Sequence, residues 1–155
     1  MATMRLLKAR LLLLLPLIAL CLLDESASHA ELGGAVSADA LQIQEKFPAD
    51  SSGQRLYVFQ IKLPTGTQIR EFANGEHVVV GVSWQGPTLP NLKQLLGPYF
   101  DTFAKRPPTK ETNHHSAEFF SDELVVQSHG QLHSFSGRAY LPQRLPAGIT
   151  ADQIN

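Results

Sequence analysis

Residues 81–86, Gly-Val-Ser-Trp-Gln-Gly, come nearest to a catalytic motif in this sequence. A serine between two glycines resembles the G-x-S-x-G turn of α/β-hydrolases, in which a sharp strand-to-helix turn exposes a nucleophilic hydroxyl. Here one residue too many separates Ser83 from the second glycine. That turn also requires a parallel sheet, whereas the flanking segments carry antiparallel hairpin patterns. We therefore interpret Ser83 as a strand serine on an exposed face.

Histidines are the next candidates, because imidazole is the commonest metal ligand in proteins. Those beyond the first thirty residues are His77, His114, His115, His129 and His133. Structural metal sites usually place closely spaced ligands on one element. His129 and His133 have such a spacing, but Gly130 interrupts it and favours a turn between them. The sequence therefore predicts solvated histidines and no metal site.

Carboxylates and phosphate-binding loops indicate no reaction either. Asp122 and Glu123 are adjacent at the start of an expected strand, so their side chains point to opposite faces and cannot share a proton. No glycine-rich phosphate loop and no dinucleotide-binding fingerprint follows any expected strand. With no nucleophile, base and oxyanion donor assembled, we expect a non-catalytic protein without cofactors.

Binding is the remaining class of function, and its candidates lie around the single tryptophan and on the helix expected after it. They are Trp84, Gln85, Gly86, Pro87, Tyr99 and Phe100. Sheet edges and exposed aromatic side chains are common means of recognising another protein, which is our leading hypothesis. The alternative is a small-molecule pocket between helix and sheet, a usual place for a ligand.

Three segments that end at Trp84 have the patterns of antiparallel strands. Residues 56–63 alternate between apolar and polar side chains, and residues 67–73 follow a Pro-Thr-Gly turn. Residues 77–84 follow Asn74-Gly75, which favours a tight type I′ hairpin. In this third segment one face consists of Val78, Val80, Val82 and Trp84. This parity predicts that Trp84 packs in the core against the helix.

The helix is expected between Leu89 and Phe103, where apolar residues recur at steps of three and four. Thr88 is placed to cap its N-terminus. Pro98 removes a helical hydrogen bond and clashes with the preceding turn, so we expect a kink or a break at Gly97. The apolar stripe of this helix should pack on one face of the sheet.

The segments after the helix predict a loop and a second hairpin. Residues 104–121 are polar and proline-bearing with no periodicity, which indicates a mobile loop. Residues 123–128 and 132–141 have strand patterns joined across His129-Gly130. From residue 142 onward, prolines favour an extended tail.

At the two ends of the domain, the sequence patterns are too short to specify more than a turn or an ambiguous segment. Thr150 and Gln153 have the spacing of a capping box and could support one terminal turn. Residues 35–47 fit either a strand or a short helix. The whole pattern predicts one α+β domain over residues 31–155: a three-stranded antiparallel meander, one kinked helix packed on a face, and a two-stranded hairpin.

Residues 1–30 have the pattern of a cleaved secretory signal peptide. Basic residues precede an uncharged run over residues 11–23, and small residues at 28 and 30 predict cleavage between Ala30 and Glu31. The run is shorter than the ~20 apolar residues of a spanning helix, so no membrane span is expected after cleavage. Lipid attachment at Cys21 is disfavoured, because Leu20 lies where a lipoprotein signal has a small residue.

Cleavage would leave a chain with no cysteine and a slight negative charge. Cys21 is the only cysteine, so no disulfide is expected despite export. The signal carries three of 13 basic and two of 14 acidic residues, which leaves 10 against 12, a net charge of −2. Nucleic acid and anionic membranes are therefore poor candidate partners. We expect a periplasmic or secreted protein whose partner is another envelope or secreted protein.

Four sequence blocks spread over residues 31–155 carry a resemblance to a known family. They are Leu-Gly-Gly at 32–34, Trp-Gln-Gly-Pro-Thr at 84–88, Leu-Leu-Gly-Pro-Tyr-Phe at 95–100 and Gly-Arg-Ala-Tyr-Leu-Pro at 137–142. With them the chain resembles a bacterial exported family known as domain of unknown function 2844. The resemblance implies export in a Gram-negative bacterium and no assigned activity.

Overall fold

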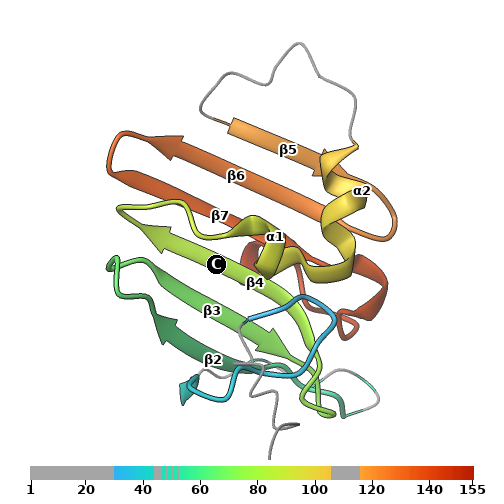
Figure 1. Cartoon of the computed structure of the whole chain (residues 1–155). Coiled ribbons are helices and arrows are strands. Elements are labelled where there is room, and N and C mark those ends of the chain that lie inside the picture. The colour runs from blue at the N-terminus through green and yellow to red at the C-terminus, as the bar shows by residue number, and fades with distance from the viewer. Residues whose placement is uncertain (1–29, 44–46, 48, 50, 52, 106–115) are drawn as a thin grey trace, which may run out of the picture.

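The computed structural model describes residues 30–43, 47, 49, 51, 53–105 and 116–155. These residues form one antiparallel sheet of seven strands in the order β1-β2-β3-β4-β7-β6-β5 (Figure 1). The strands are β1 (Leu41–Ile43), β2 (Tyr57–Lys62), β3 (Gln68–Ala73), β4 (Val79–Gly86), β5 (Ser116–Phe120), β6 (Val125–Gln131) and β7 (Ser134–Tyr140). The helical turns are α1 (Leu92–Leu96), η1 (Gly97–Tyr99), α2 (Phe100–Ala104), η2 (Pro142–Arg144) and η3 (Ala151–Gln153). The α+β class is confirmed.

The predicted meander is present as β2, β3 and β4, which pair antiparallel in sequence order. The hairpin between β3 and β4 is not the tight type I′ turn that Asn74-Gly75 favoured, because the positive φ of 59° belongs to His77. The side-chain Oδ1 of Asn74 instead accepts hydrogen bonds from the backbone N–H groups of Glu76 and Val78, at 3.0 Å each. The asparagine thus closes a longer turn than its dipeptide predicts.

A β-bulge in β4 overturns part of the predicted strand parity. The pairing passes from Phe72 with Gly81 to Ala73 with Val79, so Val80 is the extra residue. A bulge of this kind turns two successive residues toward one face. Val80 accordingly packs with Ile154, on the opposite side of the sheet from Val82. The prediction that Val80 shares the tryptophan's face was wrong.

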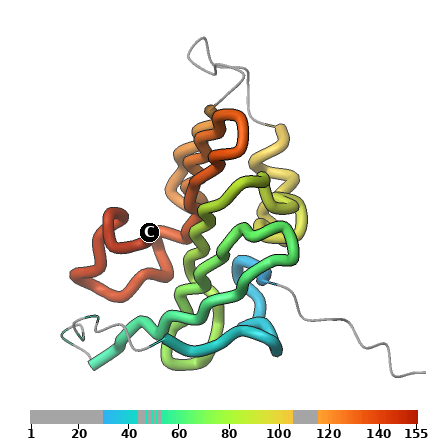
Figure 2. Tube along the Cα trace, turned by 90° about the vertical axis from the view of Figure 1, so that its left-hand side faces the viewer, coloured from blue at the N-terminus to red at the C-terminus, as the bar shows by residue number. Residues whose placement is uncertain are grey.

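The broken helix covers one face of the sheet, as Figure 2 shows from the side. Gly97 has a φ of 50° and ends α1, and Pro98 lies in the 3₁₀ turn that links α1 to α2, so the predicted break is confirmed. The N-cap is Asn91, whose Oδ1 accepts from the N–H of Gln94 at 3.3 Å. Thr88 does not cap the helix, because α1 begins four residues after it and its hydroxyl lies 2.9 Å from that of Thr67.

The core on this face confirms the packing role predicted for Trp84, which is only 2% exposed. Its buried partners come from the N-terminal segment, the helix, four strands and the residues next to two of them: Ala30, Leu32, Ile69, Val79, Val82, Leu95, Leu96, Phe103, Leu124, Val126, Ala139 and Leu141. The N–H of Leu32 donates to the main-chain oxygen of Leu95 at 2.8 Å, which ties the N-terminal segment to the helix. This face is therefore a packed core.

The C-terminal segment covers part of the opposite face, at the left of Figure 2. It was expected to be extended, yet it forms the turns η2 and η3 and buries Ile154 completely against Val58, Phe72 and Val80. The predicted capping box between Thr150 and Gln153 is confirmed. Apolar residues hold the segment on the sheet, because burial of such side chains outweighs the preference of prolines for extended backbone.

Two further predictions differ from the structure beyond the helix. Residues 116–120, expected within a mobile loop, form the edge strand β5, while residues 106–115 lie outside the described residues. The second hairpin turns at Leu132 and His133, whose φ is 62°, and not at Gly130. Gly130 is in β6, where a Cβ atom would lie 2.6 Å from the ring of Phe135, so close packing explains the glycine.

Candidate functional site

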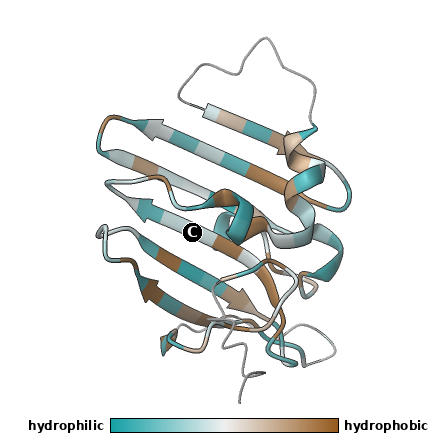
Figure 3. Cartoon of the chain, viewed as in Figure 1, coloured by the Kyte–Doolittle hydropathy of each residue, from teal (hydrophilic) through white to brown (hydrophobic). Residues whose placement is uncertain are grey.

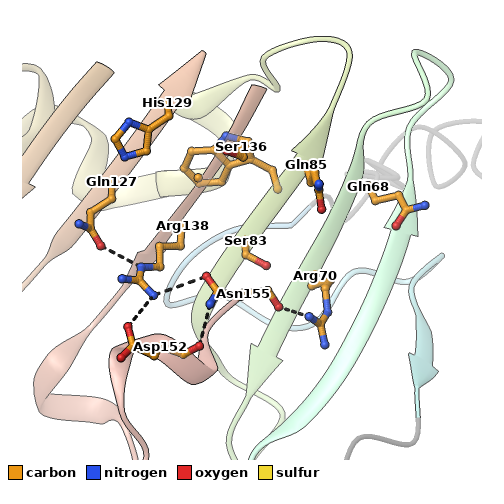
Figure 4. A pocket seen from close by; sticks show the side chains of 12 residues that line it. Gln68, Arg70, Ser83, Gln85, Gln127, His129, Ser136, Arg138, Asp152 and Asn155 are labelled. Carbon is orange, nitrogen blue, oxygen red and sulfur yellow. Dashed lines mark hydrogen bonds and ion pairs between the residues drawn. The ribbon is translucent and has the colours of Figure 1, made fainter. Parts of the chain in front are cut away.

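Polar side chains of four strands line an open groove of about 410 Å³ on the face of the sheet away from the helix (Figure 4). One row across the strands contains Gln127, Arg138, Ser83 and Arg70, and the next contains His129, Ser136, Gln85 and Gln68. Asp152 and Asn155 of the C-terminal segment complete the lining. Directly paired strand residues point to the same face, so β6, β7, β4 and β3 each add one side chain to each row.

The groove is the uncovered continuation of the face that the C-terminal segment packs on. Hydrophilic and hydrophobic residues follow one another along the strands (Figure 3), so the polarity of the sheet surface changes from position to position. Toward one end of the strands this face carries Tyr140, Gly81 and Phe72, which meet Ile154 and its neighbours. Toward the other end it carries the two polar rows. The C-terminal segment therefore covers the part of this face where the strands carry apolar side chains, and the polar part stays uncovered.

Arg138 makes hydrogen bonds to three neighbouring residues of the groove and the C-terminal segment. Its Nε donates to Oε1 of Gln127 at 2.8 Å, and its Nη1 donates to the main-chain oxygen of Ala151 at 2.6 Å and to Oδ1 of Asn155 at 3.5 Å. The same Nη1 lies 3.7 Å from Oδ1 of Asp152, whose side chain is 92% exposed. That exposed ion pair contributes little, so the hydrogen bonds to oxygens hold the guanidinium in place.

Arg70 lies on the other side of Ser83 and completes a pair of cations. Its Nη1 donates to the main-chain oxygen of Asn155, so the two arginines hold Asn155 between them (Figure 4). The guanidinium carbon lies 5.4 Å from the ring centroid of Phe72, within the range of a cation–π contact. Both arginines thus bind the C-terminal segment through its oxygens.

Glu118, His129 and Ser136 follow one another on β5, β6 and β7 and invite comparison with a catalytic triad. The Nε2 of His129 is 4.0 Å from Oε1 of Glu118, and both side chains are exposed. Among the described residues, Ser136 makes no hydrogen bond to the imidazole, although its Cα pairs with that of His129 in the sheet. A nucleophilic serine requires a base within hydrogen-bonding distance, so this series does not make an active site.

The one buried acidic side chain of the described residues lies on the other face. Glu71 is fully buried, and its carboxylate accepts from Oγ of Ser37 at 2.5 Å and from the N–H of Ser37 at 3.1 Å. Burial raises the pKa of Glu71 above its ordinary value, the hydrogen bonds from Ser37 oppose this rise, and the charge of Asp39 adds to it. The pair fastens the N-terminal segment to β3 and has no access to the groove.

The six residues predicted to bind do not converge. Gln85 lines the groove, whereas the side chain of Trp84 is in the core and Tyr99 and Phe100 pack on its helical side. Pro87 is exposed beside Gly66. At Gly86, a Cβ atom would lie 2.4 Å from Cα of Thr67, so a close approach of two chains explains that glycine. These positions therefore form no common surface.

Ser83 is buried, and the prediction that it is an exposed strand serine was wrong. It lies between the two arginines in a row beside the C-terminal segment, and these neighbours cover it. The main groove residues that the sequence did not single out are Gln68, Arg70, Gln127, Ser136, Arg138, Asp152 and Asn155. Five of them lie in segments that the sequence predicted as strands, but the strand order that gathers them could not be predicted from it.

The described part of the chain shows neither a cluster of metal ligands nor a membrane-spanning helix. No group of three histidine, cysteine or carboxylate side chains there could hold a metal ion. His114 and His115 lie outside the described residues. No helix among the described residues is long and apolar enough to cross a membrane.

The family of the chain follows from comparison with known proteins. A family model described as "Protein of unknown function (DUF2844)" matches residues 28–154, which covers all seven strands and both faces of the sheet. No curated protein and no solved structure matches the chain. The resemblance seen in the four sequence blocks is confirmed, and the chain belongs to the DUF2844 family of proteins of unknown function.

Proposed function

We propose that this protein is an exported, non-catalytic module that binds another envelope or secreted protein through the polar groove. The observation that carries the proposal is the lining of the groove: ten of its twelve residues are polar or charged, and Trp84 and Gly137 are the exceptions. Small-molecule pockets are lined mainly by apolar and aromatic side chains. Polar side chains in an open groove suit a protein surface, whose contacts are about as polar as the rest of a protein.

The distribution of the core supports this choice over the small-molecule alternative. That alternative needs a cavity between helix and sheet, near Trp84, Tyr99 and Phe100. In the described structure this space holds tightly buried side chains, among them Leu95, Leu96 and Phe103. The open volume lies on the opposite face, where exposed Gln68, Gln85 and Ser136 present hydrogen-bonding groups to solvent.

Export is the second part of the proposal, and it is supported by the signal-peptide pattern of the first thirty residues. Ala30, the first described residue, is buried with Leu32 in the core. Processing between Ala30 and Glu31 would leave Leu32 and its hydrogen bond to Leu95 in place. Intact-mass measurement of the protein from a periplasmic fraction should give a chain that begins at Glu31. A full-length or lipid-modified chain would contradict this.

Binding is tested by a photo-cross-linking residue placed at Gln85, in the middle of the groove. The matched control is the same residue at Gln94, which is exposed on α1 on the opposite face of the sheet. We expect irradiation of living cells to attach a defined envelope or secreted protein at position 85 and not at position 94. Equal attachment at both positions, or none at position 85, would refute the proposal.

A further inference from the structure

We infer that the groove receives an acidic, extended segment of the partner, with carboxylates directed at Arg70 and Arg138. The inference rests on the proposed function and adds the chemistry of the partner. Three features of the groove carry it: the way it already holds a peptide segment, the donors that remain, and the balance of charge.

The first feature is the C-terminal segment itself, which lies along one side of the groove. Arg138 donates to the main-chain oxygen of Ala151, and Arg70 donates to that of Asn155. The two guanidinium groups lie on opposite sides of Asn155, and each is hydrogen-bonded to it (Figure 4). The groove therefore binds a peptide by donating hydrogen bonds to its oxygens, and the second polar row beside it offers similar groups.

The second feature is the supply of donors. A guanidinium has five N–H groups, and those of Arg138 that have described partners are on Nε and Nη1. Among the described residues, none accepts a hydrogen bond from its Nη2. The amide oxygen of Gln127 accepts from Nε of Arg138, so the NH₂ group of Gln127 is the part of this amide that can donate to a ligand. Gln68 and Gln85 add further exposed amides. Carboxylates only accept hydrogen bonds when ionised, so they complement this surface.

The third feature is charge. Among the side chains of the lining are two guanidinium groups and one carboxylate, that of Asp152, which projects into solvent at the rim. The chain as a whole has a net charge of −1, so the groove is a positive area on a slightly negative protein. Such an area favours an acidic segment and disfavours a basic one.

Strand geometry sets the spacing of the carboxylates. Arg70 and Arg138 flank Ser83 on neighbouring strands, so their Cα atoms are about 10 Å apart, since strands lie ~4.8 Å from one another. Side chains two residues apart on an extended peptide point the same way at a separation of roughly 6.6 Å. Long arginine side chains span the difference, so acidic residues at alternate positions fit the pair.

The test uses a fluorescent peptide of about eight residues with alternating glutamate and serine, long enough at ~3.3 Å per residue to cross the groove. Its counterpart has glutamine in place of each glutamate. Binding to the purified protein is followed by fluorescence anisotropy. We expect the glutamate peptide to bind and the glutamine peptide to bind much more weakly. The affinity should fall as salt rises from about 0.05 M to about 0.5 M, because added ions screen the charges.

Variants of the exposed residue Gln85 test whether a change of charge in the groove raises or lowers the affinity in the expected direction. Gln85→Lys should tighten binding of the glutamate peptide about twofold to fivefold, and Gln85→Glu should weaken it by a similar factor. Asp152→Asn should also tighten it, because it removes the carboxylate of the rim. Gln94→Lys and Gln94→Glu make the same charge changes on the helical side and should leave the affinity unchanged. None of these side chains is buried, so each variant should fold.

Three results would overturn the inference. Equal binding of both peptides would show that charge does not select the ligand. Equal effects at positions 85 and 94 would show that the peptide does not lie in the groove. Tighter binding of an oligogalacturonate of similar charge would assign the groove to an acidic glycan. If no peptide binds while position 85 still cross-links to a protein in cells, the acidic-segment inference fails and the proposed function stands; if cross-linking fails as well, both fail.

Discussion

Truncation of Trp84 is the most direct measure of how this fold is held together. The side chain is 2% exposed and lies over Gly137 of β7, where a Cβ atom would be only 2.4 Å from Cζ2 of the indole. Because glycine has no side chain to move into the space, Trp84→Ala should leave a cavity that collapses little. We therefore expect a loss of about 3–5 kcal/mol in the free energy of unfolding, the range for truncation of a large buried aromatic. A domain has only ~5–15 kcal/mol in total.

Equilibrium urea unfolding measures this loss. Circular dichroism is the appropriate signal, because Trp84 is the only tryptophan and the variant has no indole fluorescence. Leu132→Ala is the control: Leu132 is 86% exposed at a hairpin turn, so this change should alter the free energy by less than ~0.5 kcal/mol. An unfolding free energy of Trp84→Ala equal to that of the wild type would refute the packing of the helix and N-terminal segment around this ring.

Two further predictions concern Glu71 and Gly86. Because burial raises the folded-state pKa of Glu71 above its ordinary 4.5, the folded protein binds this proton more tightly than the unfolded chain. The free energy of unfolding of the wild type should therefore fall, relative to that of Glu71→Gln, as pH rises from about 4.5 through the folded-state pKa. Urea unfolding of both proteins between about pH 4 and pH 8 tests this. Parallel pH profiles of the two proteins would contradict it. Gly86→Ala should cost roughly 1–3 kcal/mol in thermal unfolding, because the added Cβ meets the backbone of Thr67. Gly75→Ala, with no atom within 4 Å of its added Cβ, should change stability by less than ~0.5 kcal/mol, and equal losses would refute the close approach.

The local elements of the fold could be predicted because their causes are local. Alternation specified β2, the Pro-Thr-Gly turn specified where β3 follows it, and the Gly97-Pro98 sequence specified where the helix breaks. Each of these depends on backbone or periodic properties of a few neighbouring residues. The core position of Trp84 could be predicted from the alternation of β4, because the bulge lies before Val82 and leaves the parity of Val82 and Trp84 unchanged.

Long-range packing decided the features that the sequence did not reveal. The bulge at Val80 places this side chain against Ile154, far along the chain, on the other face. Residues 116–120 form β5 because β6 provides a partner, although their own pattern suggests a loop. The composition of residues 80 and 116–120 does not reveal that Ile154 or β6 will lie beside them.

The groove belongs wholly to the tertiary structure. Its sequence determinants are ordinary: polar residues at alternate positions of strands, each compatible with a solvated face. The non-sequential pairing of β4 with β7 brings Arg138 beside Ser83 and Arg70, and the C-terminal segment places Asn155 between the two arginines. The sequence alone determined which residues alternate in strands and where the helix breaks. The order of the strands decided which polar residues meet, because hydrogen bonding between strands joins segments without regard to their separation in the chain.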